Sequence, residues 1–225
     1  MRRLSVRELS PLEARVLGVL VEKAHTVPDS YPLSLNSLLS GCNQKTAREP
    51  VINATEAEVL VAVDALKSLS LAFESSGSRV SRYEHNMGRA LGLPSQSVAL
   101  LAVMMLRGPQ TSAELRSNAE RLHHFADVSS VDAFLHELAE RAPEKGGALV
   151  VKLPRAAGAR EPRWAHLLCG AVDASALQLA AESEDFVAAG ELAALKANQH
   201  AMQEQIDALR EQVERLYAEL GIARS

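Results

Sequence analysis

The stretch TEAEVLVAVDALKSLSLAFESSGSRVSRYEH, residues 55–85, contains the signals that decide the fold. Thr55 and Glu58 form a capping-box pattern, and apolar residues then recur at helical spacing. A short alternating run at 71–73 is typical of a strand, and a turn rich in Ser and Gly leads to a returning strand at 79–85. The stretch therefore predicts a helix followed by a β-hairpin.

Two more helices are predicted upstream of this stretch. Ser10-Pro11-Leu12-Glu13 places a capping Ser, a Pro at the first helical position and a Glu three residues after the cap, and this helix ends near Lys23. A second, short helix fits residues 35–39 and is closed by Gly41, and a polar loop at 43–50 leads on to Thr55. Three helices followed by a hairpin is the order of the winged variant of the helix-turn-helix.

The same order occurs a second time downstream. The predicted elements are helices at 97–106, 111–123 and 130–141, then strands at 149–153 and 163–168. Any small α+β domain with three helices is the alternative, but finding the order twice, with helix caps in place, favours two winged-helix units. We expect a mainly α fold with small β-hairpins.

The organisation follows from these elements. We expect winged-helix domain 1 at residues 1–90, a linker at 91–95, winged-helix domain 2 at 96–170, an acidic Ala-rich linker at 171–190 and a coiled-coil helix at 191–222.

The last segment repeats apolar residues at alternating spacings of three and four, which is typical of a coiled coil. Gln199 interrupts an otherwise apolar series, and the oligomerisation residues are Leu192, Leu195, Met202, Ile206, Leu209, Val213, Leu216 and Leu220. Ile and Val in one series with Leu in the other favour a two-stranded parallel coil, and hence a homodimer. Alanines widen the apolar stripe, so a long helix that docks on its own domains stays an alternative.

Composition describes an ordinary globular chain, with 225 residues and a net charge of −4. Residues 1–95 carry 11 basic and 10 acidic side chains, residues 96–170 carry 9 and 8, and residues 171–225 carry 4 and 10. This mild basic excess in the front part permits DNA binding without arguing strongly for it. We find no signal-peptide pattern and no membrane-spanning run, and Cys42 and Cys169 lie far apart, so we expect a cytoplasmic protein with two free thiols.

The third helix of each unit is poorly suited to enter a DNA groove, because carboxylates such as Glu56, Asp64 and Glu137 lie on its exposed face. Basic residues lie instead in loops and wings, including Lys152. We expect phosphate contacts from Lys45, Arg48, Arg79, Arg82, Arg155, Arg160 and Arg163, and possible base contacts from Asn43 and Gln44. The alternative is that solvated hairpins carry Lys and Arg in any case.

Motifs for catalysis or metal binding are not evident. His123, His124, His136 and Asp127 invite a metal assignment, but no closed-site spacing supports it, and a partly buried capping role fits better. We find no Gly-rich phosphate loop and no nucleophile elbow. We expect no cofactor and no enzymatic activity.

Several segments resemble the YceH-like family of uncharacterised bacterial proteins. They are residues 42–51, 107–111, 114–116, 153–155 and 164–168. The resemblance covers roughly Leu9 to Gly170 and implies tandem winged-helix domains, but it implies no activity. The predicted coiled coil lies outside these segments.

These observations predict a cytoplasmic, dimeric winged-helix DNA-binding protein, of regulatory type, that contacts phosphates mainly through loops and wings. The alternative is a winged-helix protein–protein adaptor without direct DNA binding, which the acidic third helices and near-neutral domains favour.

Overall fold

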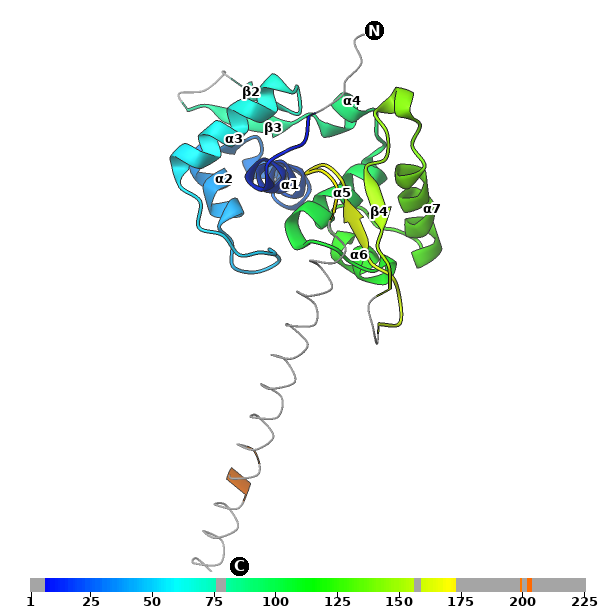
Figure 1. Ribbon diagram of the computed structural model, residues 1–225. Coiled ribbons are helices and arrows are strands. Elements are labelled where there is room, and N and C mark those ends of the chain that lie inside the picture. Colours follow the sequence, from blue (N-terminus) through cyan, green and yellow to red (C-terminus); the bar gives the residue numbers. More distant parts are fainter. Residues whose placement is uncertain (1–6, 76–79, 156–158, 173–198, 200–201, 204–225) are drawn as a thin grey trace, which may run out of the picture. The chain divides into compact units, whose positions relative to one another are not determined.

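The computed structural model describes residues 7–75, 80–155, 159–172, 199 and 202–203 (Figure 1). The chain divides into one unit up to Val172 and a second from Asp173 onward. The described part of the first unit is mainly helical with small antiparallel sheets, which confirms the predicted fold class at this level.

Local capping signals place three helix starts correctly. Helix α1 (Pro11–Thr26) follows Ser10, whose hydroxyl accepts a hydrogen bond from the Glu13 N–H (3.2 Å) while the Glu13 carboxylate accepts one from the Ser10 N–H (2.9 Å). Reciprocal capping boxes also open α3 (Glu56–Ser68) and α6 (Ser112–Ala119). Each box satisfies backbone N–H groups that the first helical turn leaves without partners.

The first half of the unit contains α1, a 3-10 turn (Pro28–Ser30), β1 (Leu33–Ser34), α2 (Leu35–Cys42) and α3, followed by β2 (Ala72–Ser75) and β3 (Arg82–His85). The three strands form one antiparallel sheet in the order β1-β3-β2, with Leu33 opposite Tyr83 and Glu74 opposite Tyr83 on the other side. Strand β1 is missing from the predicted elements. The hairpin therefore pairs back onto the segment between the first two helices.

The second half contains α4 (Met87–Leu91), α5 (Ser95–Arg107), α6, α7 (Val128–Ala139), a 3-10 turn (Pro143–Lys145), β4 (Val150–Lys152) and β5 (Trp164–His166). Strands β4 and β5 pair in antiparallel register, and Gln110 pairs with Trp164 on the other side of β5. Gln110 precedes α6 as β1 precedes α2, so each hairpin receives an extended segment from the start of its half. Helix α6 ends at Ala119, short of the predicted His123.

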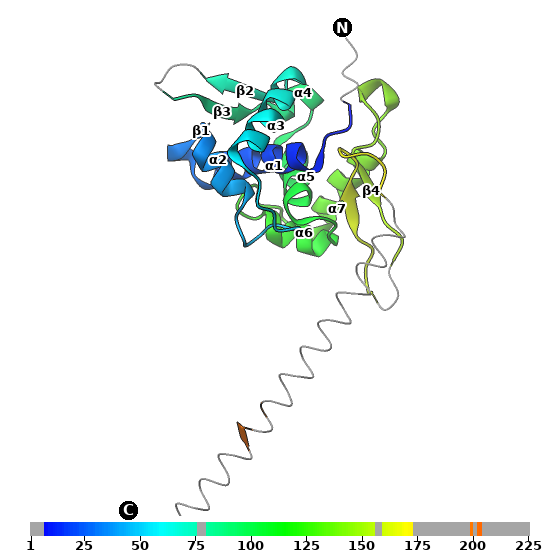
Figure 2. The same ribbon diagram turned by 60° about the vertical axis from the view of Figure 1, so that its left-hand side comes forward.

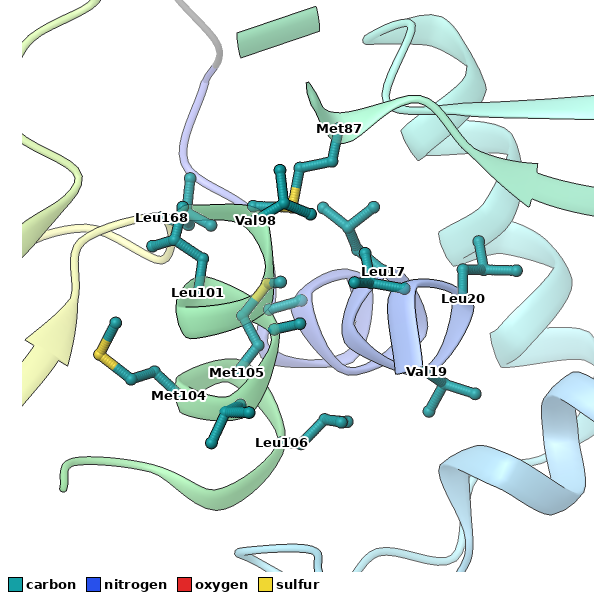
Figure 3. Packing of buried hydrophobic residues seen from close by; sticks show 14 of the residues in the cluster. Leu17, Val19, Leu20, Met87, Val98, Leu101, Met104, Met105, Leu106 and Leu168 are labelled. Atoms are coloured by element: carbon teal, nitrogen blue, oxygen red, sulfur yellow. The ribbon is translucent and has the colours of Figure 1, made fainter. Parts of the chain in front are cut away.

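The two halves share one hydrophobic core, because α1 and α5 pack directly against each other (Figure 3). Leu17 and Leu20 of α1 and Leu101 and Met105 of α5 are buried there. Gly18 permits the close approach, since a Cβ at this position would lie 3.0 Å from Cγ of Leu106. The two hairpins lie on opposite sides of this central pair of helices (Figure 2).

Further contacts join the ends of the first unit. The Leu9 N–H donates a 2.8 Å hydrogen bond to the Leu168 carbonyl, which ties the segment before α1 to the segment after β5. Arg141, after α7, donates to the Leu91 carbonyl at the end of α4. Leu91 itself is buried, so the expected linker at 91–95 begins inside the core.

The predicted coiled coil at 191–222 lies almost entirely outside the described residues, as do Asp173 to Gly190 of the predicted acidic linker. Of the eight oligomerisation residues, Met202 alone is described; it is helical and 58% exposed. The pairing of this helix between two chains stays a prediction.

Candidate functional site

The second hairpin gathers exposed basic side chains at one end. Lys152 ends β4 and Arg163 directly precedes β5, and the Leu153 N–H donates to the Arg163 carbonyl (2.8 Å), which continues the strand pairing by one residue. Arg155 and Arg160 extend beyond this last pair, and all four side chains are exposed. The hairpin geometry thus brings together the four cations that the sequence separates by up to eleven positions.

The four cations differ in how they are engaged. Lys152 lies 5.3 Å from the ring centroid of Trp164. Arg163 donates to the Pro109 carbonyl (3.1 Å) and lies 3.6 Å from a carboxylate oxygen of Glu114. Arg155 and Arg160 make no hydrogen bond or ion pair with any residue in the described part of the chain. These two predicted phosphate contacts are therefore exposed and unpaired among the described residues.

The first hairpin, formed by β2 and β3, has fewer basic side chains available for phosphate contact among the described residues than the second. Arg82 is exposed, but its guanidinium donates to the Pro32 carbonyl (2.8 Å) and so fastens β3 to the segment before β1. Arg79 lies outside the described residues. Among the described residues of this hairpin Arg82 is therefore the one Lys or Arg side chain, and it already fastens β3 to the segment before β1.

The burial of Arg48 contradicts the prediction that this residue contacts phosphates. Only 4% of the residue is exposed, and its guanidinium donates to both carboxylate oxygens of Glu22 (3.1 and 2.6 Å) and to the Gly41 carbonyl (3.0 Å). Burial alone would raise the pKa of Glu22, but the hydrogen bonds and charge of Arg48 outweigh it, and the pKa lies below its usual value. A phosphate contact by Arg48 would require breaking a buried ion pair.

The Asn43 side chain makes hydrogen bonds within the fold rather than presenting its amide to a DNA base. Its amide accepts from the Ala54 N–H and donates to the Ala54 carbonyl, both at 2.8 Å, and so ties the end of α2 to the start of α3. Gln44 is half-buried, accepts from Lys23 (3.3 Å) and donates to the Thr46 carbonyl (3.0 Å). The polar loop is thus internally bonded, contrary to the expectation that these two amides face a base edge.

Lys45 is the exception in this loop. It is exposed and makes no hydrogen bond or ion pair with the residues that the structure describes. Of the four loop residues predicted to contact DNA, Lys45 therefore remains a candidate.

The outward face of α3 is acidic, as predicted, but it is also apolar. Glu56 and Asp64 are exposed on it, and between them Leu60 and Val61 are exposed as well, Val61 by 70%. Lys67, near the end of the helix, is held by Asp64 (3.1 Å) and Glu74 (2.5 Å). This face offers no accessible cation to a phosphate.

The exposed face of α7 differs in composition from that of α3. Ala133, His136 and Glu137 are exposed on it, and the His136 ring lies edge-on to Trp164 with 5.2 Å between centroids. Asp127 caps this helix by accepting from the Ser130 N–H (2.7 Å).

His123 and His124, which precede α7, each contact a different neighbouring side chain. His123 packs edge-on against Phe125, and Nδ1 of His124 lies 2.5 Å from a carboxylate oxygen of Glu120. Over the described ranges no group of three His, Cys, Asp or Glu side chains is arranged to hold a metal ion. Capping is performed by Asp127 rather than by the histidines.

A cavity of about 510 Å³ lies between the two halves and was not anticipated from the sequence. Its walls come from the start of α1, the loop 49–54, the end of α5, and the end of β5 with the segment after it. They include the buried Arg15 and the half-buried His166. Because these segments are far apart in sequence, no spacing pattern could join them. The sequence does contain one sign that Arg15 is buried. Arg15 lies three residues after Leu12 and four before Val19, on the apolar stripe of its helix.

No helix among the described residues has the length and apolar character that crossing a membrane requires.

Comparisons with known proteins give a family model and several relatives. A model described as "Protein of unknown function, DUF480" matches residues 9–159. The chain is 62% identical over 221 residues to a UPF0502 protein of Burkholderia pseudomallei strain 668, which covers 98% of this chain and 93% of that protein. It is 60% identical over 219 residues to a UPF0502 protein of Leptothrix cholodnii, covering 96% of this chain and 97% of that protein. It is 65% identical over 205 residues to one of Methylibium petroleiphilum, covering 91% and 86%.

Four of the five segments behind the predicted resemblance, at 42–51, 107–111, 114–116 and 153–155, lie within the matched range, and the expectation of an uncharacterised bacterial family is confirmed. The chain belongs to the DUF480 family, and its relatives are UPF0502 proteins of bacteria.

Proposed function

We propose that the protein binds duplex DNA as a dimer, with two winged-helix units per chain and with phosphate contacts made mainly by the second hairpin. The order of elements supports the winged-helix assignment. The first half has three α-helices followed by a hairpin, and the second half has the short α4 and then three α-helices followed by a hairpin. The first hairpin pairs with an extended segment that precedes α2, and the second pairs with one that precedes α6.

The observation that carries the proposal is the group of exposed cations on the second hairpin. Arg155 and Arg160 have no acidic partner among the described residues, and Lys152 and Arg163 lie beside them at the base of the loop. Guanidinium groups suit phosphate oxygens because their N–H donors match the geometry of an anion. A wing that carries such groups can follow a DNA backbone without reading its bases.

The third helices are not assigned a groove contact. Both α3 and α7 expose carboxylates, and neither exposes an unengaged Lys or Arg among the described residues. Carboxylates facing the phosphate-lined groove repel, and phosphate neutralisation supplies most of the affinity of non-specific binding. We therefore assign binding to the hairpin and to Lys45.

The dimer rests on the spacing of apolar residues in the tail, from Leu192 to Leu220, which favours a two-stranded coil. Two chains related by a twofold axis would contact two related DNA half-sites.

The test is binding of the purified full-length chain to random-sequence duplex DNA, measured by fluorescence anisotropy across a salt series. The proposal predicts that log affinity falls linearly with log salt, with a slope of roughly −0.9 for each phosphate neutralised. Absence of binding at low salt would contradict it.

An adaptor that binds another protein is the second candidate, and the face of α3 favours it. Leu60 and Val61 form an exposed apolar strip bordered by Glu56 and Asp64. An apolar strip with an acidic border suits a partner surface that is apolar at its centre and basic at its rim. Absence of DNA binding in the experiment above would leave this candidate.

A further inference from the structure

The cavity between the two halves has the dimensions of a small-molecule site. Its volume is about 510 Å³, and small-molecule sites in proteins span about 300–1,000 Å³. Both halves contribute to its walls: Leu12 and Ile52 come from the first, and Met104, Met105 and His166 from the second. Such sites form preferentially at junctions between structural units.

Arg15 is a buried cation at this cavity without an acidic partner. It is 3% exposed, and its guanidinium donates to the carbonyl of Cys42 (3.2 Å) and the carbonyl of Pro50 (2.7 Å). Its Nε has no hydrogen-bond partner, and no carboxylate of the described residues lies within ion-pair distance of it. Burying a charge without a counter-ion is costly.

Arg48, the other buried arginine at this part of the fold, differs from Arg15 because a carboxylate pairs with it. Both of its terminal nitrogens donate to the Glu22 carboxylate. Burial, and then the charge of Arg48, lower the pKa of Arg15, but a guanidinium stays protonated in proteins. The nearby charge of Glu49 acts in the opposite direction, but no carboxylate of the described residues forms an ion pair with Arg15, which therefore keeps a positive charge without a paired counter-ion.

His166 is a half-buried side chain in the wall of the same cavity. Its Nδ1 is buried and has no hydrogen-bond partner. Burial lowers the pKa of His166 to about 4, so the ring is neutral at pH 7 and carries one N–H. The Nδ1 atom has no surface open to the cavity, so His166 contributes a neutral part of the wall rather than a hydrogen bond to a ligand.

We infer that this cavity binds a small organic monocarboxylate, with its carboxylate at the Arg15 guanidinium and its apolar body against Leu12, Ile52, Met104 and Met105. The inference does not depend on DNA binding. The apolar walls account for the body of the ligand, and the guanidinium without a paired counter-ion accounts for its charge.

Two acidic residues restrict the ligand to a single charge. Glu49 and Glu58 also line the cavity, and both are exposed, which places them toward its mouth. The Glu58 carboxylate is held by the Thr55 N–H and hydroxyl, both at 2.7 Å, so it does not turn inward to neutralise Arg15. A dicarboxylate or a phosphate would bring extra negative charge next to these groups, so we expect neither to bind.

The experiment uses the full chain and two readouts. Benzoate and hexanoate are the probes, and benzamide, hexanamide and inorganic phosphate are the controls. Ligand binding to the folded state raises the melting temperature. It also protects Cys169, a half-buried thiol that lines the cavity, from a thiol reagent. The second thiol, Cys42, is fully buried and burial raises its pKa to about 12, so it reacts far more slowly.

The expected result is that at least one carboxylate raises the melting temperature and, at ten times its Kd, slows modification of Cys169 roughly tenfold. The amides and phosphate should do neither. Equal effects of carboxylates and amides, or no effect of either carboxylate at millimolar concentration, would overturn the inference.

Two variants test the location. Ala54→Leu narrows the cavity without removing Arg15, and Ala133→Leu, on the exposed face of α7, is its matched control. Ala54→Leu should abolish both ligand effects in a chain that still melts cooperatively, and Ala133→Leu should leave them unchanged. Arg15→Met should also abolish them; if that variant does not fold, Ala54→Leu decides. Ligand effects that persist in folded Ala54→Leu would overturn the assignment to this cavity.

Discussion

Arg48 and Glu22, 26 residues apart in the chain, form a largely buried ion pair in which Nη1 and Nη2 of Arg48 each donate to one oxygen of the Glu22 carboxylate, at 3.1 and 2.6 Å. Arg48 also donates to the carbonyls of Gly41 and Ala47. The pair therefore fixes the loop between α2 and α3 against α1. The ion pair therefore has a structural role, and Arg48 is not part of a surface that could contact DNA.

Breaking this pair should be strongly destabilising. Arg48→Ala leaves the Glu22 carboxylate without its main partner, and removing one member of a buried pair costs about 3–5 kcal/mol of unfolding free energy. Urea denaturation of the full chain measures the loss. Lys67→Ala, which breaks a half-exposed ion pair with Glu74, is the control and should cost no more than about 1 kcal/mol. Equal losses for the two variants would contradict the structural role of Arg48.

Two half-buried histidines should make stability depend on pH. Burial lowers the pKa of His85 and of His166 to about 4, below the value near 6.5 of an unfolded histidine. The unfolded chain therefore binds protons first, and the stability that these neutral rings provide is present above pH ~6.5 and lost as the pH falls toward about 4. Urea midpoints measured from pH 7.5 to 4 should fall across this window.

His166→Gln should make that fall shallower, because one of the two rings no longer titrates. A profile that is as steep in His166→Gln as in the wild type would show that His166 is not the titrating group.

Local signals predicted the helices well because capping is a short-range effect. Ser10 with Glu13, Thr55 with Glu58 and Thr111 with Glu114 each needed a partner only three residues away. Strand β1 was missed because two residues are too few for an alternating pattern. Helix α4 was missed because it has five residues and Asn86 makes no side-chain capping bond.

The candidate site was predicted less well, for a different reason. Arg155 and Arg160 were found because basic residues that cluster in a hairpin loop stay exposed whatever surrounds the hairpin. Arg48 has the same local signature, and its burial depends on Glu22, which no spacing rule connects to it. Asn43 was assigned to base reading for the same reason, although its amide bonds the backbone of Ala54.

The face of α3 distinguishes wing contact from groove insertion. Val61→Lys places a cation at the centre of its exposed face. If α3 lay in the major groove, this change would raise DNA affinity by adding a phosphate contact. Wing contact predicts an affinity within about twofold of the wild type at fixed salt, measured by anisotropy. A gain that grows as the salt is lowered would instead place α3 on the DNA.

The predicted coiled coil makes a separate prediction about assembly. A chain that ends at Gly190 lacks the heptad residues from Leu192 onward and should be monomeric by light scattering, whereas the full chain should be a dimer. The truncated chain should keep the thermal unfolding of the first unit, which ends at Val172. A dimer without the tail would show that other surfaces join the chains.

The central claim is that the second hairpin holds DNA phosphates, and the salt slope of DNA affinity tests it most directly. The slope is compared for the wild type, for Arg155→Ala with Arg160→Ala, and for Arg89→Ala with Lys145→Ala, which removes two exposed cations from outside the hairpins. Loss of two phosphate contacts per chain should make the slope shallower by roughly 1.8 for each chain that is bound. The account predicts this change for the hairpin variant and the wild-type slope for the control; an unchanged slope in the hairpin variant would contradict it.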